Sequence, residues 1–190
     1  MMVKIIGEFG YEQALYGLGL SYGLTSGITY EEFIKNNSLL NKLSMTAFTL
    51  YKKEAGHNKF LESIQIWLDV IAPRYWWSEA DTYRIGETKQ SESTMHTLLK
   101  KPFTQDMFEF PIPDDILSML ESYRNSRKFD LIKNILPEGF LQRRVWNLNY
   151  KVLRNIISQR RNHKLVQWKY FCDYLMNNLR YREYFVDLNY

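Results

Sequence analysis

The sequence is poor in the residues that form disulfides and hold metals. Cys172 is the only cysteine among 190 residues, so an intramolecular disulfide framework is excluded and a reducing compartment is expected. It lies in the aromatic run 168–174 with no triad pattern of His and Asp or Glu around it, which favours a packed thiol. The three histidines, His57, His96 and His163, have no spacing suited to zinc. We therefore expect no metal site.

The sequence also lacks a long apolar run and a strong net charge. No stretch approaches the ~18 apolar residues of a membrane-spanning helix, and residues 1–6 carry no long signal region. We therefore predict a cytoplasmic protein with no membrane partner. The net charge of +4 and the pI near 9.0 are mild and suit an anionic small molecule as well as RNA. Because no dense Lys/Arg run marks a nucleic-acid arm, we predict no nucleic-acid partner.

Common catalytic motifs are absent as well. There is no Gly-rich phosphate loop, no G-x-S-x-G elbow and no H-E-x-x-H helix. What the chain has is apolar residues at 45%, of which many are aromatic, enough for a packed core in one domain over residues 1–190. Arginines, amides and hydroxyls gather near the ends of expected elements, where they suit anions and polar heterocycles.

The periodicity predicts an α+β fold with a small central sheet flanked by helices. A period of two predicts strands at 3–7, 64–70 and 143–148. Helical spacing and capping signals predict helices at 11–22, 29–36, 39–55, 73–83, 113–126, 129–136, 149–161 and 165–179. Thr29 and Glu32 form an expected capping box. Residues 86–108 have no clean period and are expected to be a loop.

Two series of residues follow a known family in order and spacing. The first is Gly56-His57, Glu62, Ala72-Pro73 and Tyr83-Arg84-Ile85. The second is Leu136-Pro137, Arg143, Trp146, Asn149, Lys151, Asn155 and Arg160, followed by Val166-Gln167-Trp168. With Leu20-Ser21-Tyr22-Gly23 near the start, the chain resembles the flavin-dependent thymidylate synthases.

This resemblance implies a fold, a reaction and a set of ligands. The family is a homotetramer that holds FAD and dUMP at sites shared between subunits. NADPH supplies the reducing equivalents and methylenetetrahydrofolate the carbon that becomes the thymine methyl. The resemblance thus implies an FAD-dependent methyltransferase of the thymidylate synthase type, in which the cofactor carries the difficult chemistry and no protein nucleophile is needed.

The resemblance also assigns roles to individual residues. The expected FAD contacts are Ser21, His57, Arg84, Asn149, Lys151 and Asn155. Arg143 and Arg160 would face the pyrimidine nucleotide, and Arg160 would act in catalysis by polarising a pyrimidine carbonyl. Simpler roles stay open. His57 could end a helix, Asn149 could be a helix N-cap, and Asn155 and Arg160, about 140° apart on a helix, could be exposed polar positions.

The chain departs from the family where the nucleotide phosphate is held. Thr82-Tyr83-Arg84 replaces Arg-His-Arg, and Glu79 stands where the family has Gln. Further along, the family has a Ser and, two positions later, an Arg. Aligned without a gap, this chain has Glu92 and Thr94 at these positions, and a shift of one residue gives Ser93 and Met95 instead. Each lost charge-assisted hydrogen bond removes about 1.5–3 kcal/mol from phosphate binding.

The replacement run 89–96 still offers Lys89, Ser91, Ser93 and His96. Ser91 and Ser93 are therefore candidates for substrate binding, and a plain surface loop is the alternative. Three interpretations follow. The first is a divergent flavin enzyme acting on dUMP or a related pyrimidine nucleotide, and the second is a non-catalytic relative that binds or sequesters a nucleotide or another ligand. The third is a structural or interaction protein that keeps only the fold.

Overall fold

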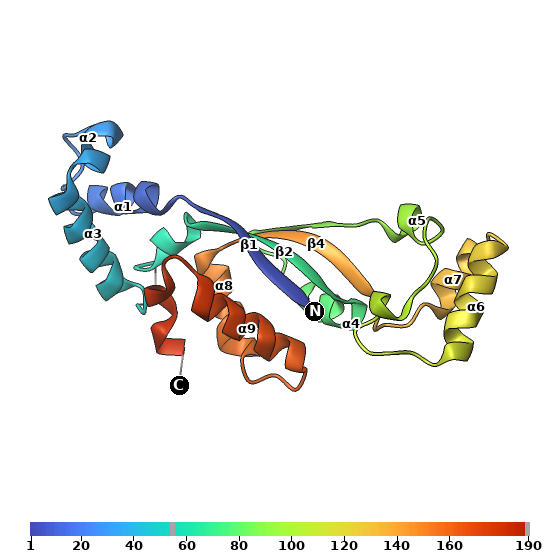
Figure 1. Ribbon diagram of the computed structural model, residues 1–190. Helices are drawn as coiled ribbons and strands as arrows, with labels where there is room; N and C mark the ends of the chain where they lie inside the picture. The colour runs from blue at the N-terminus through green and yellow to red at the C-terminus, as the bar shows by residue number, and fades with distance from the viewer. Residues whose placement is uncertain (54–55, 189–190) are drawn as a thin grey trace. The chain divides into compact units, whose positions relative to one another are not determined.

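The architecture is a small sheet combined with helices, as the α+β prediction stated. It is seen in a computed structural model that describes residues 1–53 and 56–188 (Figure 1). The strands are β1 (Met2–Phe9), β2 (Gln65–Pro73), β3 (Glu87–Ser91) and β4 (Leu141–Asn149). They form one four-stranded sheet in the order β1-β2-β4-β3.

Hydrogen bonds between the strands show that neighbours run antiparallel. Asn147 donates its side-chain amide to the Ile66 carbonyl, whereas Arg143, four residues earlier, pairs with Asp69. Residue numbers along β4 decrease where those of the paired residues along β2 increase, so the two strands are antiparallel. The bonds from Asn149 to Gly86 and from Glu92 to Arg143 give the same relation between β4 and β3.

The strand β3 corrects the expectation of a loop at 86–108. Its residues, Glu87–Ser91, are all polar, so they show no apolar alternation from which a strand could be predicted. As an edge strand it needs only one paired side, and β4 supplies that side. The same region also holds the short helix α5 (Thr94–Thr97) and a 3₁₀ turn, η2 (Gln105–Met107).

The chain groups into two compact units that interleave along the sequence. Unit 1 contains residues 1–4, 69–84 and 89–146, and unit 2 contains residues 5–68, 85–88 and 147–190. Each of the four strands contributes residues to both units. Neither unit is a continuous stretch of chain, and the single domain over 1–190 stays a prediction.

Unit 2 is largely helical. It contains α1 (Tyr11–Leu20), α2 (Tyr30–Lys35), α3 (Asn37–Leu50), η1 (Lys59–Glu62), α8 (Tyr150–Arg160), α9 (Val166–Asn178) and η3 (Arg182–Leu188). Helix α1 packs against α3, and α8 packs against α9 and η1. The side chain of Arg154 holds η3 to α8 through a two-bond ion pair with Asp187, at 2.9 and 2.8 Å. The turn η3 was not among the expected elements.

Helix ends in unit 2 follow their capping residues. The capping box of Thr29 and Glu32 is present, as predicted. Helix α3 begins after Asn36, whose side chain accepts from the Leu39 amide, two residues before the expected start. It ends at Leu50, earlier than the predicted end at position 55, which lies outside the described residues.

Unit 1 is built around indole rings. It contains α4 (Arg74–Ala80), α5, α6 (Asp114–Asn125) and α7 (Phe129–Ile135). Trp76, Trp77 and Trp146 are fully buried and meet edge to face, with centroids 4.9 to 6.2 Å apart. A second apolar cluster contains Leu98, Phe103, Phe108, Leu120, Ile132 and Leu136. No helix within residues 1–53 and 56–188 has the length and apolar character of a membrane span.

Candidate functional site

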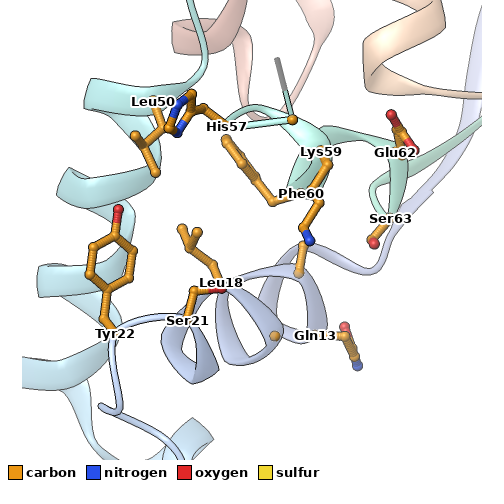
Figure 2. Close-up of a pocket in the computed structure, with 13 residues that line it drawn as sticks. Gln13, Leu18, Ser21, Tyr22, Leu50, His57, Lys59, Phe60, Glu62 and Ser63 are labelled. Carbon is orange, nitrogen blue, oxygen red and sulfur yellow. The ribbon is translucent and has the colours of Figure 1, made fainter. Parts of the chain in front are cut away.

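A pocket of about 650 Å³ lies in unit 2 (Figure 2). Its walls are α1, the end of α3 and the segment 56–63. Small-molecule sites commonly have volumes of ~300–1,000 Å³ and combine apolar walls with a few polar groups. The lining has this character, since it includes Leu18, Leu50 and Phe60 together with hydroxyl, imidazole and ammonium groups. This pocket is therefore the candidate site.

A close backbone approach fixes one end of α1 beside the pocket. Gly10, which precedes α1, has a φ of 89°, and a Cβ atom there would lie 2.4 Å from the Ser63 carbonyl oxygen. Only glycine adopts this conformation and this approach without strain. Ser63 lines the pocket, so Gly10 holds the start of α1 against the opposite wall.

Two of the residues assigned to FAD by resemblance, Ser21 and His57, line this pocket together. Ser21 follows the last residue of α1, and His57 lies across the open space, near Leu50 (Figure 2). Both side chains are exposed. Lys59, also exposed, comes from the same segment as His57, and its side chain extends toward α1 (Figure 2). Lys59 was not predicted, although its place two residues after the Gly-His pair was a usable signal.

Lys151 connects α8 to the same pocket. Its Nζ lies 2.6 Å from Oε1 of Glu62, and Glu62 is a lining residue. Asn155 lies one turn further along α8 and is exposed, with its Oδ1 accepting from the Gln159 amide at 3.0 Å. Ser21, His57 and Lys151 are thus brought to one pocket or its edge, and Asn155 makes only a local contact among the described residues.

Asn149 has a structural role. Its Oδ1 accepts from the Val152 amide at 2.9 Å, which caps α8. Its Nδ2 donates to the Gly86 carbonyl at 3.4 Å, and the side chain is buried. The N-cap alternative is confirmed, and contact with FAD stays a prediction.

Arg160 stacks on an indole near the end of α8. Its guanidinium carbon lies 5.0 Å from the ring centroid of Trp168, which is fully buried. The structure therefore brings together two parts of the family pattern, Arg160 and the Gln-Trp pair. Arg160 is half-buried, so the alternative of a freely exposed polar position is not what the structure shows.

The residues assigned to the nucleotide in unit 1 are differently placed. Arg143 forms a two-bond ion pair with Asp69, with Nε–Oδ1 at 2.8 Å and Nη2–Oδ2 at 2.5 Å. The Asp69 side chain is buried, whereas Arg143 is exposed. The hydrogen bonds from Arg143 lower the pKa of Asp69, against the effect of burial. The guanidinium of Arg143 is thus already paired with a carboxylate of the same chain.

Lys89, the cation expected in the replacement run, is also used within unit 1. Its Nζ donates to the Tyr83 carbonyl at 3.1 Å and lies 4.8 Å from the ring centroid of Trp146. Arg144, which was not predicted, pairs with Asp81 through Nη1 at 2.8 and 3.0 Å and covers the Trp77 ring. Both cations therefore stabilise the indole cluster.

The other predicted residues of unit 1 lie on its surface. Arg84 is exposed after α4, Ser91 ends β3, and Ser93 precedes α5 without capping it through its side chain. In unit 2 Cys172 is buried, and burial raises the pKa of its thiol to about 12. This confirms a packed thiol. Within the described residues no cluster of three potential metal ligands occurs.

The fold of this chain is similar to that of proteins with solved structures. Two are crystal structures of the flavin-dependent thymidylate synthase ThyX from Helicobacter pylori with FAD and dUMP. They are 18% and 17% identical to this chain, with TM-scores of 0.75 and 0.77, and each comparison covers 99% of both chains. This chain has the flavin-dependent thymidylate synthase fold. No protein-family model and no curated protein matches the sequence.

The comparison confirms the fold inferred from the resemblance. At 17–18% identity it carries no information about activity. The agreement over 99% of both chains nonetheless shows that the rewritten run 89–96 lies within a fold of the ThyX type rather than at a break in it.

Proposed function

We propose that this protein is a divergent flavin-dependent thymidylate synthase-like enzyme that binds FAD through the unit 2 pocket. The supporting observation is that Ser21, His57 and Lys151, matched to the family by sequence, meet at one pocket or its edge in a chain whose fold neighbours hold FAD and dUMP. The reaction proposed is one-carbon transfer to dUMP or a related pyrimidine nucleotide.

The pocket residues suit a dinucleotide cofactor. Lys59 and His57 are exposed and line the same pocket, where Lys59 extends toward α1 and His57 lies near Leu50 (Figure 2). An ammonium group and an imidazole in one pocket suit an anionic pyrophosphate. Phe60 and Tyr22 line the same space and offer apolar surface to a flat ring. When bound, FAD supplies the redox chemistry, and the residues here bind and orient it. NADPH and methylenetetrahydrofolate are the proposed co-substrates.

The proposed nucleotide contacts are Arg160 and Arg143, with Ser91 and Ser93 as further candidates. In this proposal Arg160 polarises a pyrimidine carbonyl and so stabilises the charge that develops on the ring. Its stacking on Trp168 limits the rotamers available to the guanidinium, which favours a fixed donor over a mobile one.

We also propose that the protein assembles into a homotetramer. In unit 2, α3 exposes Met45 at 73% and Phe48 at 46%, and both line a small apolar pocket with Tyr11 and Tyr184. Apolar groups of this size gathered on one helix suit a subunit contact. The molar mass from light scattering tests this directly, because a monomer has 22.9 kDa.

A second function is favoured by the cations of unit 1. Arg143 pairs with Asp69 and Lys89 with the Tyr83 carbonyl, and Glu92 is an exposed carboxylate in the replacement run. Such a site holds a phosphate weakly, because its positive groups already have partners and an acid adds repulsion. The alternative is therefore a non-catalytic relative that has lost the reaction and binds or sequesters a nucleotide or another ligand.

Variants of Arg160 separate these functions. We expect Arg160→Ala to abolish dUMP binding, measured by calorimetry with FAD present, while the far-UV circular dichroism stays unchanged. Arg160→Lys is the matched control, which keeps the charge but loses the planar fork and should retain partial binding. Full dUMP affinity in Arg160→Ala would remove Arg160 from the site. Binding of dUMP without turnover in the parent would favour the non-catalytic relative.

A further inference from the structure

Unit 1 contains a second pocket, which the function proposed above does not use. Its volume is about 350 Å³, and it lies between the segments 92–107 and 140–142. None of the residues assigned above to FAD or to the nucleotide lines it. It does include Glu92 and Thr94, two positions where this chain departs from the family pattern.

The floor of this pocket is apolar and well packed. Leu98 and Phe103 are each 4% exposed, and the Phe103 ring meets Phe140 edge to face at 6.4 Å. Phe140 in turn packs against Phe108 at 5.7 Å. A floor of interlocked rings keeps its shape without a ligand, so the cost of ordering it on binding is small.

Polar groups on the walls are already engaged. The Gln142 amide donates to the Glu92 carbonyl at 2.9 Å and accepts from Arg144. The Thr94 hydroxyl accepts from Lys133 at 2.9 Å. A ligand rich in hydroxyls or amides would therefore leave its polar groups unpaired inside the pocket, which is unfavourable.

The rim of this pocket is charged. Lys100 and Lys101 are exposed lining residues, and among the described residues their ammonium groups have no hydrogen-bond or ion-pair partner. Two carboxylates, Glu92 and Asp106, line the same pocket. Among the described residues neither forms an ion pair with Lys100 or Lys101, so both ammonium groups stay available to a ligand.

From these observations we infer a binding site for a compact, apolar, preferably aromatic ligand that carries one carboxylate. The rings of the floor accept the apolar body, and the ammonium groups of Lys100 and Lys101 pair with the acid at the rim. The volume of about 350 Å³ lies near the small end of the usual range for ligand pockets. The site therefore takes a ligand of one fused ring system, and it is separate from the FAD pocket in unit 2.

The probe for this site is 2-naphthoate, titrated into the full-length protein and followed by amide NMR. We expect saturable shifts at residues 97–103 and 140–142. The double variant Lys100→Ala/Lys101→Ala should bind about threefold to thirtyfold more weakly, the effect of losing two exposed ion pairs. Lys128→Ala, an exposed lysine of the same unit outside this pocket, is the matched control and should bind like the parent.

The uncharged probe 2-naphthamide isolates the role of the acid. We expect it to bind the parent as weakly as 2-naphthoate binds the double variant. No saturable shifts at millimolar 2-naphthoate, or equal affinities of parent and double variant, would overturn the inference. FAD titration of the double variant keeps this test apart from the proposed function, because Lys100 and Lys101 lie outside the FAD pocket.

Discussion

The cations that line the unit 2 pocket differ from those around the indole cluster of unit 1. In unit 2 the side chains of His57 and Lys59 face a pocket of about 650 Å³, and within the described part of the chain neither has a hydrogen-bond or ion-pair partner. In unit 1 Arg143, Arg144 and Lys89 are bound to Asp69, Asp81 and the Tyr83 carbonyl. A cation beside an open pocket can bind an anionic ligand, whereas a cation with an internal partner must first give it up.

This difference bears on the proposed binding of FAD and of the nucleotide. The residues matched to FAD lie mostly in unit 2, where the site is open. The phosphate arginines of the family would lie in unit 1, where this chain has replaced them and where Lys89 and Arg144 lie over the rings of the indole cluster. The expected result is a protein that binds a flavin more readily than a nucleotide phosphate.

The largest effect should come from the indole cluster of unit 1. Trp146 is fully buried against Trp76 and Trp77, and Lys89 lies over its ring. We expect Trp146→Ala to lower the free energy of unfolding by about 3–5 kcal/mol, measured by urea denaturation. Trp67, which is 37% exposed, is the control, and Trp67→Ala should lower the free energy of unfolding clearly less than Trp146→Ala. Equal decreases in the two variants would show that the cluster is not the core of unit 1.

A smaller effect should come from the cap of α8 in unit 2. Asn149→Ala removes the acceptor for the Val152 amide and should destabilise the protein by about 1–2 kcal/mol. Asn149→Asp keeps the cap acceptor but loses the donor to Gly86. In urea denaturation it should therefore lose less free energy of unfolding than Asn149→Ala. If Asn149→Asp also loses FAD affinity at unchanged stability, the residue contacts the cofactor as well as capping the helix.

The smallest effect on stability should depend on pH. The folded-state pKa of Asp69 lies below its ordinary value because Arg143 donates hydrogen bonds to it. Its contribution is therefore present above the unfolded-state pKa of about 3.9 and is lost as the pH falls through the folded-state pKa. Asp69→Asn should lower Tm by a few degrees at pH 7, and the gap from the parent should narrow progressively as the pH falls below ~4.

The control for this test is Asp106→Asn, because Asp106 is an exposed carboxylate of the same unit. It should leave Tm unchanged across the pH range. A gap between Asp69→Asn and the parent that stays the same from pH 7 into the acid range would show that the variant acts through packing rather than through the ion pair.

Regular elements were predictable from the sequence because their signals are local. The capping box of Thr29 and Glu32, the apolar alternation of β2 and the helical spacing of α8 each lie within one element. The edge strand β3 was missed because its side chains are all polar and its pairing partner, β4, lies more than 50 residues away along the chain.

The candidate site was predictable only in part. The matches at Ser21, His57 and Lys151 located a pocket or its edge. The engagement of Arg143 with Asp69 and of Lys89 with Tyr83 and Trp146 depends on contacts across the sheet and around the indole cluster. No local pattern encodes those contacts, so the availability of a cation for a ligand could not be inferred from residue type.

The most direct test of the account is a titration of purified protein with FAD, followed by its visible absorption after removal of unbound cofactor. We predict stoichiometric bound flavin in the parent and an affinity at least tenfold lower in Lys59→Ala, since a charge-assisted hydrogen bond to a phosphate would be lost. Lys42→Ala, an exposed lysine of α3 outside the pocket, should bind like the parent. A parent protein that takes up no FAD would contradict the proposal that unit 2 holds a flavin.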